Sequence, residues 1–232
     1  MGSIENTPFF CSWSGGKDSC LALYHAMQNG GRPQHLLTML TEDDKRSRSH
    51  GLPLALIQQQ SQSLSIPLVV RSTSWDDYEQ TFISLLSEFK QEGIETGIFG
   101  DIDLDAHRQW CERVCSTVDM RACHPLWQKN RRGLLNEFLG LGFKATIISV
   151  KEGTLDKSFL GRILNENTIK DIENAGIDAS GEAGEYHTMV TDGPVFSSPV
   201  HAVAGDQTLR DGYCFLDVSA VSPDDSDIQS QA

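Results

Sequence analysis

The loop SGGKDS at residues 14–19 constrains the fold more than any other segment of this chain of 232 residues. An apolar, strand-like run at residues 8–13 precedes it, and a helix-like run at residues 21–27 follows it. Adjacent glycines let the backbone approach an anion closely, and the next helix presents free N–H groups and the positive end of its dipole. The spacing differs from a Walker A loop, in which four residues separate the first glycine from Gly-Lys-Ser/Thr. We therefore expect a phosphate-binding loop of another kind.

Strand-like and helix-like segments alternate through the first half of the chain. Strands are predicted at residues 8–13, 35–41, 67–71, 96–99 and 121–124, and helices at 17–28, 52–64, 76–91 and 103–117. This alternation is typical of an α/β fold with a doubly wound parallel sheet. Because such sheets bind ligands beyond the carboxyl ends of their strands, the residues after the first four strands should surround one crevice.

The pattern changes after about residue 126. A helix is predicted at residues 131–141, a buried strand at 143–150, and short helices at 157–164 and 168–175. Strand-like segments follow at 186–190 and 202–218, the latter interrupted by Asp206 and Gly212. We divide the chain into a phosphate-loop domain at residues 1–125, a smaller α+β domain at 126–218 and a disordered acidic tail at 219–232.

The charge balance argues against a nucleic-acid partner. Nineteen Lys and Arg face 32 Asp and Glu, a formal net charge of -13, which repels a phosphate backbone. No run approaches the length of a membrane span, and the amino terminus lacks the pattern of a signal peptide. These features predict a cytoplasmic protein that binds neither nucleic acid nor a membrane.

The six cysteines are expected to be buried or free thiols, since a reducing compartment disfavours disulfides. Cys111 and Cys115 are one helical turn apart, a spacing that also fits a thiol pair for sulfur transfer or half of a metal site. No second Cys or His pair at zinc-finger spacing completes such a site.

The loop at residues 14–19 resembles the signature of the PP-loop, or N-type ATP pyrophosphatase, superfamily. Its members cleave ATP between the α- and β-phosphates, hold the leaving pyrophosphate in this loop and adenylate a substrate oxygen. A glycine-rich, serine-capped helix start without function is the plainer interpretation, which the position near the start of an α/β chain disfavours.

A second polar segment, GEAGEYHT at residues 181–188, places two carboxylates, an imidazole, a phenol and a hydroxyl between and beside two glycines. Taken alone it also fits a solvated turn. Together with SGGKDS it resembles the carboxyl-terminal motif of the diphthine-ammonia ligase-like family of PP-loop proteins, a resemblance that covers roughly residues 8 to 200. The resemblance implies an adenine-nucleotide α-hydrolase-like ATP-binding domain, followed by a smaller acceptor-binding domain that closes on the ATP site.

The family's reaction amidates diphthine, a modified histidine of an elongation factor, with ATP giving AMP and pyrophosphate and ammonium supplying nitrogen. The chain departs from the diphthamide pattern at GDIDLDAHR, residues 100–108, which resembles bacterial relatives with another acceptor. The partners implied are therefore ammonia and a carboxylate acceptor, which is diphthine or a small molecule such as a cobalamin-related metabolite. A second copy of the chain, forming a homodimer, is a further candidate partner.

The resemblance assigns candidate roles, with ATP and Mg²⁺ as cofactors. The phosphates would be bound by Ser14, Gly15, Gly16, Lys17, Asp18 and Ser19, with Met39, Leu40, His50 and Gly100 completing the nucleotide site. Mg²⁺ would be held by Asp18 and Asp101. Catalysis is assigned to Lys17, Asp18, Glu182, Glu185 and His187, and acceptor binding to Arg108, Arg162, Gly181, Gly184, Tyr186 and Thr188. On a helix face, Arg108 and Arg162 fit a structural salt bridge equally well.

Two other functions stay open on sequence. A sulfur transferase acting on adenylated tRNA would use a reactive cysteine such as Cys111, but would also need a basic surface. A non-catalytic sensor would use ATP occupancy to drive domain closure, and it would not need the second carboxylate cluster at residues 181–188.

Overall fold

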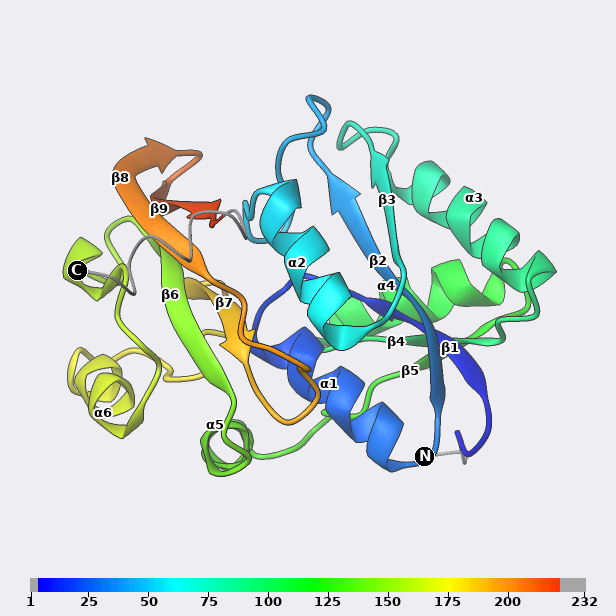
Figure 1. The fold of residues 1–232 in the computed structure, drawn as a ribbon, viewed down its shortest axis with the longest axis horizontal. Coiled ribbons are helices and arrows are strands. Elements are labelled where there is room, and N and C mark those ends of the chain that lie inside the picture. Colours follow the sequence, from blue (N-terminus) through cyan, green and yellow to red (C-terminus); the bar gives the residue numbers. More distant parts are fainter. Residues whose placement is uncertain (1–3, 222–232) are drawn as a thin grey trace, which may run out of the picture.

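The computed structural model describes residues 4–221, and its first half forms a five-stranded parallel sheet. The strand order is β3-β2-β1-β4-β5. The strands are β1 (Pro8–Ser12), β2 (Arg32–Leu40), β3 (Leu68–Ser72), β4 (Thr96–Ile98) and β5 (Arg121–Cys123). The chain winds outward from β1 to β3 and then returns to β4 on the other side of β1, so the winding reverses between β1 and β4 (Figure 1).

Helices cover both faces of this sheet, as the strand pattern requires. The helices are α1 (Lys17–Gln28), α2 (Leu54–Leu64), α3 (Tyr78–Gln91) and α4 (Asp105–Ser116). Phe9 and Cys11 pack in one buried cluster with residues of α1 and α2, whereas Phe10 packs in another with residues of α3 and α4. Alternate residues of a strand point to opposite faces, so the predicted doubly wound α/β fold is confirmed.

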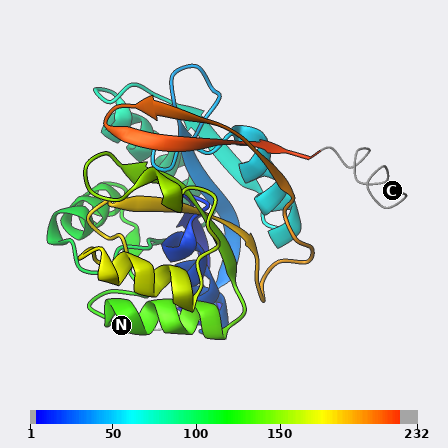
Figure 2. The ribbon, with the colours of Figure 1, turned by 90° about the vertical axis from the view of Figure 1, so that its left-hand side faces the viewer.

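The second half forms an antiparallel sheet with its own helices. Its strands are β6 (Lys144–Lys151), β7 (Tyr186–Asp192), β8 (Ala202–Arg210) and β9 (Tyr213–Ala220), in the order β7-β6-β9-β8. Helices α5 (Arg131–Gly140) and α6 (Glu166–Asn174) and the short 3₁₀ helix η1 (Lys157–Phe159) belong to this part. Figure 1 shows the antiparallel sheet with α5 and α6 on the side of the molecule away from α3, and Figure 2 looks onto that side. The predicted second, smaller α+β unit is thus present.

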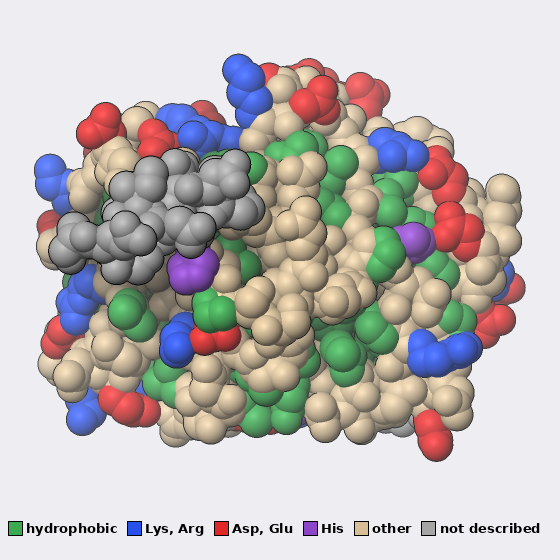
Figure 3. All heavy atoms as spheres, viewed as in Figure 1, with side chains coloured by type: hydrophobic (Ala, Val, Ile, Leu, Met, Phe, Trp, Pro, Cys, Tyr) green, Lys and Arg blue, Asp and Glu red, His purple; other side chains and the backbone are tan. Residues whose placement is uncertain are grey.

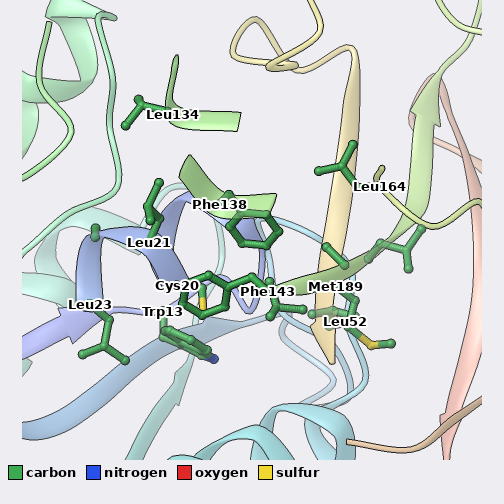
Figure 4. Packing of buried hydrophobic residues seen from close by; sticks show 14 of the residues in the cluster. Trp13, Cys20, Leu21, Leu23, Leu52, Leu134, Phe138, Phe143, Leu164 and Met189 are labelled. Atoms are coloured by element: carbon green, nitrogen blue, oxygen red, sulfur yellow. The ribbon is translucent and has the colours of Figure 1, made fainter. Parts of the chain in front are cut away.

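A shared core joins the two halves. Phe138 of α5 stacks on Phe143, with ring centroids 4.9 Å apart. Both belong to the buried cluster that includes Trp13, Cys20 and Met189, which come from both halves of the chain (Figure 4). Burying apolar surface between the two sheets stabilises their relative position, and this fixes β7 against the loop that follows β1.

Some segment boundaries differ from those predicted. The helix expected at residues 157–164 is only the single turn η1, because Gly161 adopts a φ of +80° and Ile163 bridges to Thr146 of β6. The predicted interruption of residues 202–218 at Gly212 is confirmed, because the chain turns there at Asp211 and Gly212, both with positive φ. The interruption predicted at Asp206 is wrong: β8 continues through this residue with a register shift between Ala204 and Gln207. Strand β9 extends to Ala220, two residues into the predicted tail, and residues 222–232 lie outside the described residues.

The surface agrees with the composition. On the face shown in Figure 3, Lys and Arg side chains of the described residues are scattered among Asp and Glu and form no continuous basic area.

Within residues 4–221, no helix combines the length and the apolar character needed to cross a membrane. All six cysteines are free, and all but Cys214 are buried.

Candidate active site

The phosphate loop, residues 14–19, links the carboxyl end of β1 to α1 at the reversal point of the sheet. Gly15 adopts a φ of +78°, and a Cβ there would lie 2.7 Å from Oε1 of Gln60. A Cβ on Gly16 would lie 2.2 Å from Cε1 of His50. Both positions therefore require glycine, and the loop lies where doubly wound sheets bind ligands.

Strand β7 of the second sheet holds this loop in place. The Lys17 N–H donates to Oγ1 of Thr188 at 3.1 Å, and the Val190 N–H donates to the Gly15 carbonyl at 2.9 Å. The buried Gln60 amide adds bonds from Nε2 to the carbonyls of Gly15 and Val190, at 3.0 and 2.7 Å. The loop conformation thus depends on contacts between both halves of the chain.

The Lys17 side chain is buried between the two halves. Its Nζ lies 2.6 Å from Oδ2 of Asp18 and 5.6 Å from the centre of the Tyr186 ring. Burial disfavours the charged form, but Asp18 and Tyr186 more than offset it and hold the pKa of Lys17 above its ordinary value. Lys17 therefore carries a fixed positive charge directly behind the loop.

A cavity of about 700 Å³ opens beside the phosphate loop. That volume is within the range of small-molecule sites. Eleven of the candidate residues line it: Ser14, Asp18, Ser19, Met39, His50, Gly100, Asp101, Gly181, Glu182, Gly184 and His187. The structure therefore brings the phosphate loop and the polar loop, residues 181–188, to one cavity.

Two histidines from different halves meet at this cavity. The rings of His50 and His187 lie 4.5 Å apart, and Nδ1 of His50 is 3.0 Å from the Thr188 carbonyl. Burial and Lys17 lower the pKa of His187 to about 4, and burial and His187 lower that of His50 well below its usual value. Both imidazoles are therefore neutral near pH 7 and act as hydrogen-bonding groups rather than cations.

The polar loop presents one of its two carboxylates to the cavity. Oε1 of Glu182 accepts a bond from the Ile102 N–H at 3.1 Å, and burial together with Asp18 raises its pKa. Glu185 does not line the cavity, and its Oε2 is buried without a hydrogen-bond partner among the described residues. Tyr186 is buried and donates to the Ala179 carbonyl at 2.6 Å. Glu182 is thus the carboxylate of this loop with direct access to a ligand.

Three further candidates lie away from the cavity lining. Leu40 is buried in the sheet. Arg108 stacks on Trp127, 4.7 Å from the ring centre, and pairs with Asp105 and Glu112. Arg162 pairs with Asp171 and stacks on Phe159. Both arginines have acidic and aromatic partners that account for their positions.

The cavity also has lining residues that carry no role in the sequence prediction. Arg48 stacks 4.8 Å from the centre of the Trp75 ring and donates to the Thr73 carbonyl. Trp75 is 70% exposed, and Tyr78 and Trp110 lie beside it on the same wall. The sequence signal that could have identified this wall is the position of Trp75 shortly after the third strand. Ligands of doubly wound sheets bind beyond the carboxyl ends of the strands.

Fold and site together define an α/β protein of PP-loop-like architecture, whose second, antiparallel sheet closes on the phosphate loop. Comparison with known protein families gives two matches: the diphthamide synthase N-terminal domain over residues 9–122, and the diphthamide synthase C-terminal domain over residues 130–221. The chain therefore belongs to the diphthamide synthase family, the diphthine-ammonia ligase-like PP-loop proteins.

The chain is also similar to curated proteins that are named diphthine-ammonia ligases. A diphthine-ammonia ligase of Rattus norvegicus is 26% identical over 231 residues, covering 89% of this chain and 86% of the relative. That of Danio rerio is 26% identical, covering 88% and 90%. That of Schizosaccharomyces pombe is 28% identical over 237 residues, covering 91% of this chain and 39% of the relative.

Proposed function

We propose that this protein is an ATP-dependent ligase that adenylates a substrate carboxylate and then transfers ammonia to it. The observation that carries the proposal is the single cavity of about 700 Å³ onto which both the phosphate loop and the polar loop open. The diphthine-ammonia ligase name of the relatives supports the reaction class. The acceptor is diphthine on an elongation factor or a small-molecule carboxylate.

In the first step an acceptor carboxylate oxygen attacks the α-phosphate of ATP, forming an acyl-adenylate as pyrophosphate leaves. Ser14 and Ser19 line the cavity and offer hydroxyl groups to the β- and γ-phosphates, and Gly15 and Gly16 allow close approach of the backbone. The α1 amino terminus and the Lys17 charge stabilise the negative charge that accumulates on pyrophosphate.

In the second step ammonia displaces AMP and leaves an amide. Glu182 lies on the cavity wall, and its raised pKa makes its carboxylate a stronger base than that of an exposed glutamate. It is therefore suited to orient ammonium and take up its proton. The neutral His187 and His50 can hydrogen-bond the acceptor without repelling ammonium. Closure by the second sheet limits access of water to the acyl-adenylate.

The acceptor is expected to bind at the wall formed by Arg48, Trp75 and Tyr78. A guanidinium group matches a carboxylate in a bidentate manner, and Arg48 is the arginine that lines the cavity in the described part of the chain. It takes the anchoring role that the sequence suggested for Arg108 and Arg162.

The cavity's donor set fits Mg²⁺, which prefers a few carboxylate oxygens together with phosphate oxygens. Asp18, in the phosphate loop, is on the cavity wall. Glu182 lies close enough that the Asp18 charge helps to raise the pKa of Glu182. Asp18 would hold the ion, which would supply neutralisation of the triphosphate charge. Asp101 also lines the cavity, but its immediate neighbours are histidine and cysteine side chains.

Product analysis tests the proposal. The protein would be incubated with Mg-ATP, ammonium and either a diphthine-bearing elongation factor or a desalted metabolite extract, and the nucleotide products measured. We expect acceptor-dependent AMP and pyrophosphate, lost in Asp18→Asn and Glu182→Gln and retained in Asp206→Asn, an exposed position on β8. ADP and phosphate as the products, or AMP formed equally by Asp18→Asn, would refute the mechanism.

A further inference from the structure

Three potential metal ligands converge beside the cavity, and two of them, Asp101 and Cys111, line it. Asp101 follows β4, Cys111 lies on α4, and His124 follows β5, so three separate elements bring them together. The ligand atoms of these residues all lie within 4.8 Å of one another. Oδ2 of Asp101 is 3.7 Å from Sγ of Cys111 and 3.6 Å from Nε2 of His124.

The His124 imidazole carries an unused ligand atom. The residue is only 7% exposed, and its Nε2 is buried without a hydrogen-bond partner among the described residues. The ring is stacked on Phe99, with centroids 5.4 Å apart, and packs edge-on against Trp127. Because leaving a buried polar atom unpaired costs roughly 1–3 kcal/mol, its fixed orientation toward Asp101 and Cys111 indicates a ligand between them.

Two of the three ligand separations are those expected around a tetrahedral ion. Zinc lies about 2.0–2.2 Å from carboxylate oxygen, about 2.0–2.1 Å from imidazole nitrogen and about 2.3 Å from thiolate sulfur, which places neighbouring ligands roughly 3.3–3.6 Å apart in a tetrahedron. The two separations from Oδ2 of Asp101, 3.6 and 3.7 Å, need little adjustment. Sγ of Cys111 and Nε2 of His124 lie within 4.8 Å of each other and would draw together around the ion. A sulfur, a nitrogen and an oxygen ligand suit Zn²⁺, whereas Mg²⁺ takes oxygen ligands.

We propose that Asp101, Cys111 and His124 form a binding site for Zn²⁺, separate from the Mg²⁺ at Asp18. Asp101 and Cys111 also line the cavity, so the fourth coordination position faces it and can accept water or an oxygen or nitrogen atom of a bound molecule. Nδ1 of His107 lies 3.3 Å from the other oxygen of Asp101 and orients that carboxylate as an outer partner. Binding releases the Cys111 proton to solvent. The proposal is independent of the ligase reaction.

Cobalt substitution tests the site on the reduced, metal-free, full-length protein. Titration with Co²⁺ should give one tetrahedral site per chain, with the charge-transfer absorption of a cobalt-thiolate bond, and Zn²⁺ should displace it. Cys111→Ser should abolish that absorption. The matched control is Cys115→Ser, a buried cysteine one turn further along α4 that lies outside the cluster and should retain it.

Further arms separate ligand loss from misfolding. His124→Gln removes a ligand, so binding should weaken by more than the roughly 10–100-fold that loss of an outer partner such as His107 costs. X-ray absorption of the zinc-loaded wild type, which does not rely on any variant, should count one sulfur ligand. The proposal would be overturned if the wild type showed no cobalt-thiolate absorption, or if X-ray absorption counted more than one sulfur ligand. It would also be overturned if a folded Cys111→Ser variant kept the cobalt-thiolate absorption.

Discussion

The backbone N–H of Lys17 donates to the side-chain hydroxyl of Thr188, which is 171 positions further along the chain, at a distance of 3.1 Å. Lys17 begins α1 in the parallel sheet's half, and Thr188 lies in β7 of the antiparallel sheet. Both residues are buried. This hydrogen bond is one of those that join the phosphate loop to the second half, and its buried partners have no water to bond with if it is broken.

Replacing Thr188 with valine is expected to destabilise the protein by about 1–3 kcal/mol, since it leaves the buried Lys17 N–H without an acceptor while conserving volume. Urea denaturation would measure the loss. Thr188→Ser, which retains the hydroxyl, should recover part of it. Thr208→Val is the matched control, because Oγ1 of Thr208 has no hydrogen-bond partner among the described residues. Equal stability of Thr188→Val and wild type would contradict this role.

Gly100 should not tolerate alanine. A Cβ there would lie 2.9 Å from both the backbone carbon of Asp18 and the amide nitrogen of Ser19. Because backbone cannot swing aside as a flexible side chain does, the end of β4 would be forced away from the start of α1, at about 1–3 kcal/mol. Thermal and chemical denaturation would test this.

The control for that substitution is Gly140→Ala at the end of α5. A Cβ there meets nothing within 4 Å, and the helical position favours alanine over glycine by about 0.5–1 kcal/mol. The two variants should therefore shift stability in opposite directions. Destabilisation of similar size in both would argue that the approach of Gly100 to the loop has no special cost.

The alternation of strands and helices in the first half was predictable because each element is encoded by local periodicity. The apolar run ending at Trp13 and the glycines after it locate β1 and the phosphate loop without tertiary information. The winding of the sheet then follows from the general rules for α/β folds. The prediction that residues after β1, β2, β3 and β4 surround one crevice agrees with the lining of the cavity.

Contacts between distant segments were not predictable in the same way. The sequence analysis assigned acceptor binding to Arg108 and no role to Arg48, yet Arg48 lies on the cavity wall and Arg108 stacks on Trp127. The two loop segments could be paired only through a family resemblance, since the packing of β7 on the loop depends on a core shared by both sheets. The orientation of His124 toward Asp101 likewise arises only from the fold.

Gln60 links three backbone and side-chain groups around the phosphate loop and is fully buried. Its Oε1 accepts from Nε1 of Trp13 at 3.0 Å, and its Nε2 donates to the carbonyls of Gly15 and Val190. Gln60→Leu would leave all three groups without this partner, so we expect a loss of about 3–5 kcal/mol. Gln58→Leu, at an exposed position of the same helix, is the control. Denaturation curves that coincide for the two variants would disprove the role of Gln60.

His187 should make stability fall as pH falls from about 6.5 toward about 4. Its folded pKa is lowered from 6.5 to about 4 by burial and by Lys17, so in this window the unfolded chain takes up a proton that the folded protein does not. The contribution of the neutral His187 side chain to the free energy of unfolding is complete above the unfolded pKa and amounts to at most about 3 kcal/mol.

Urea denaturation at about pH 7 and about pH 5 should show a smaller pH dependence for His187→Gln than for wild type, whereas the exposed His201→Gln should behave as wild type. NMR titration of the wild-type imidazole gives the direct check, and protonation of His187 near pH 6.5 in the folded protein would rule out the buried, neutral state.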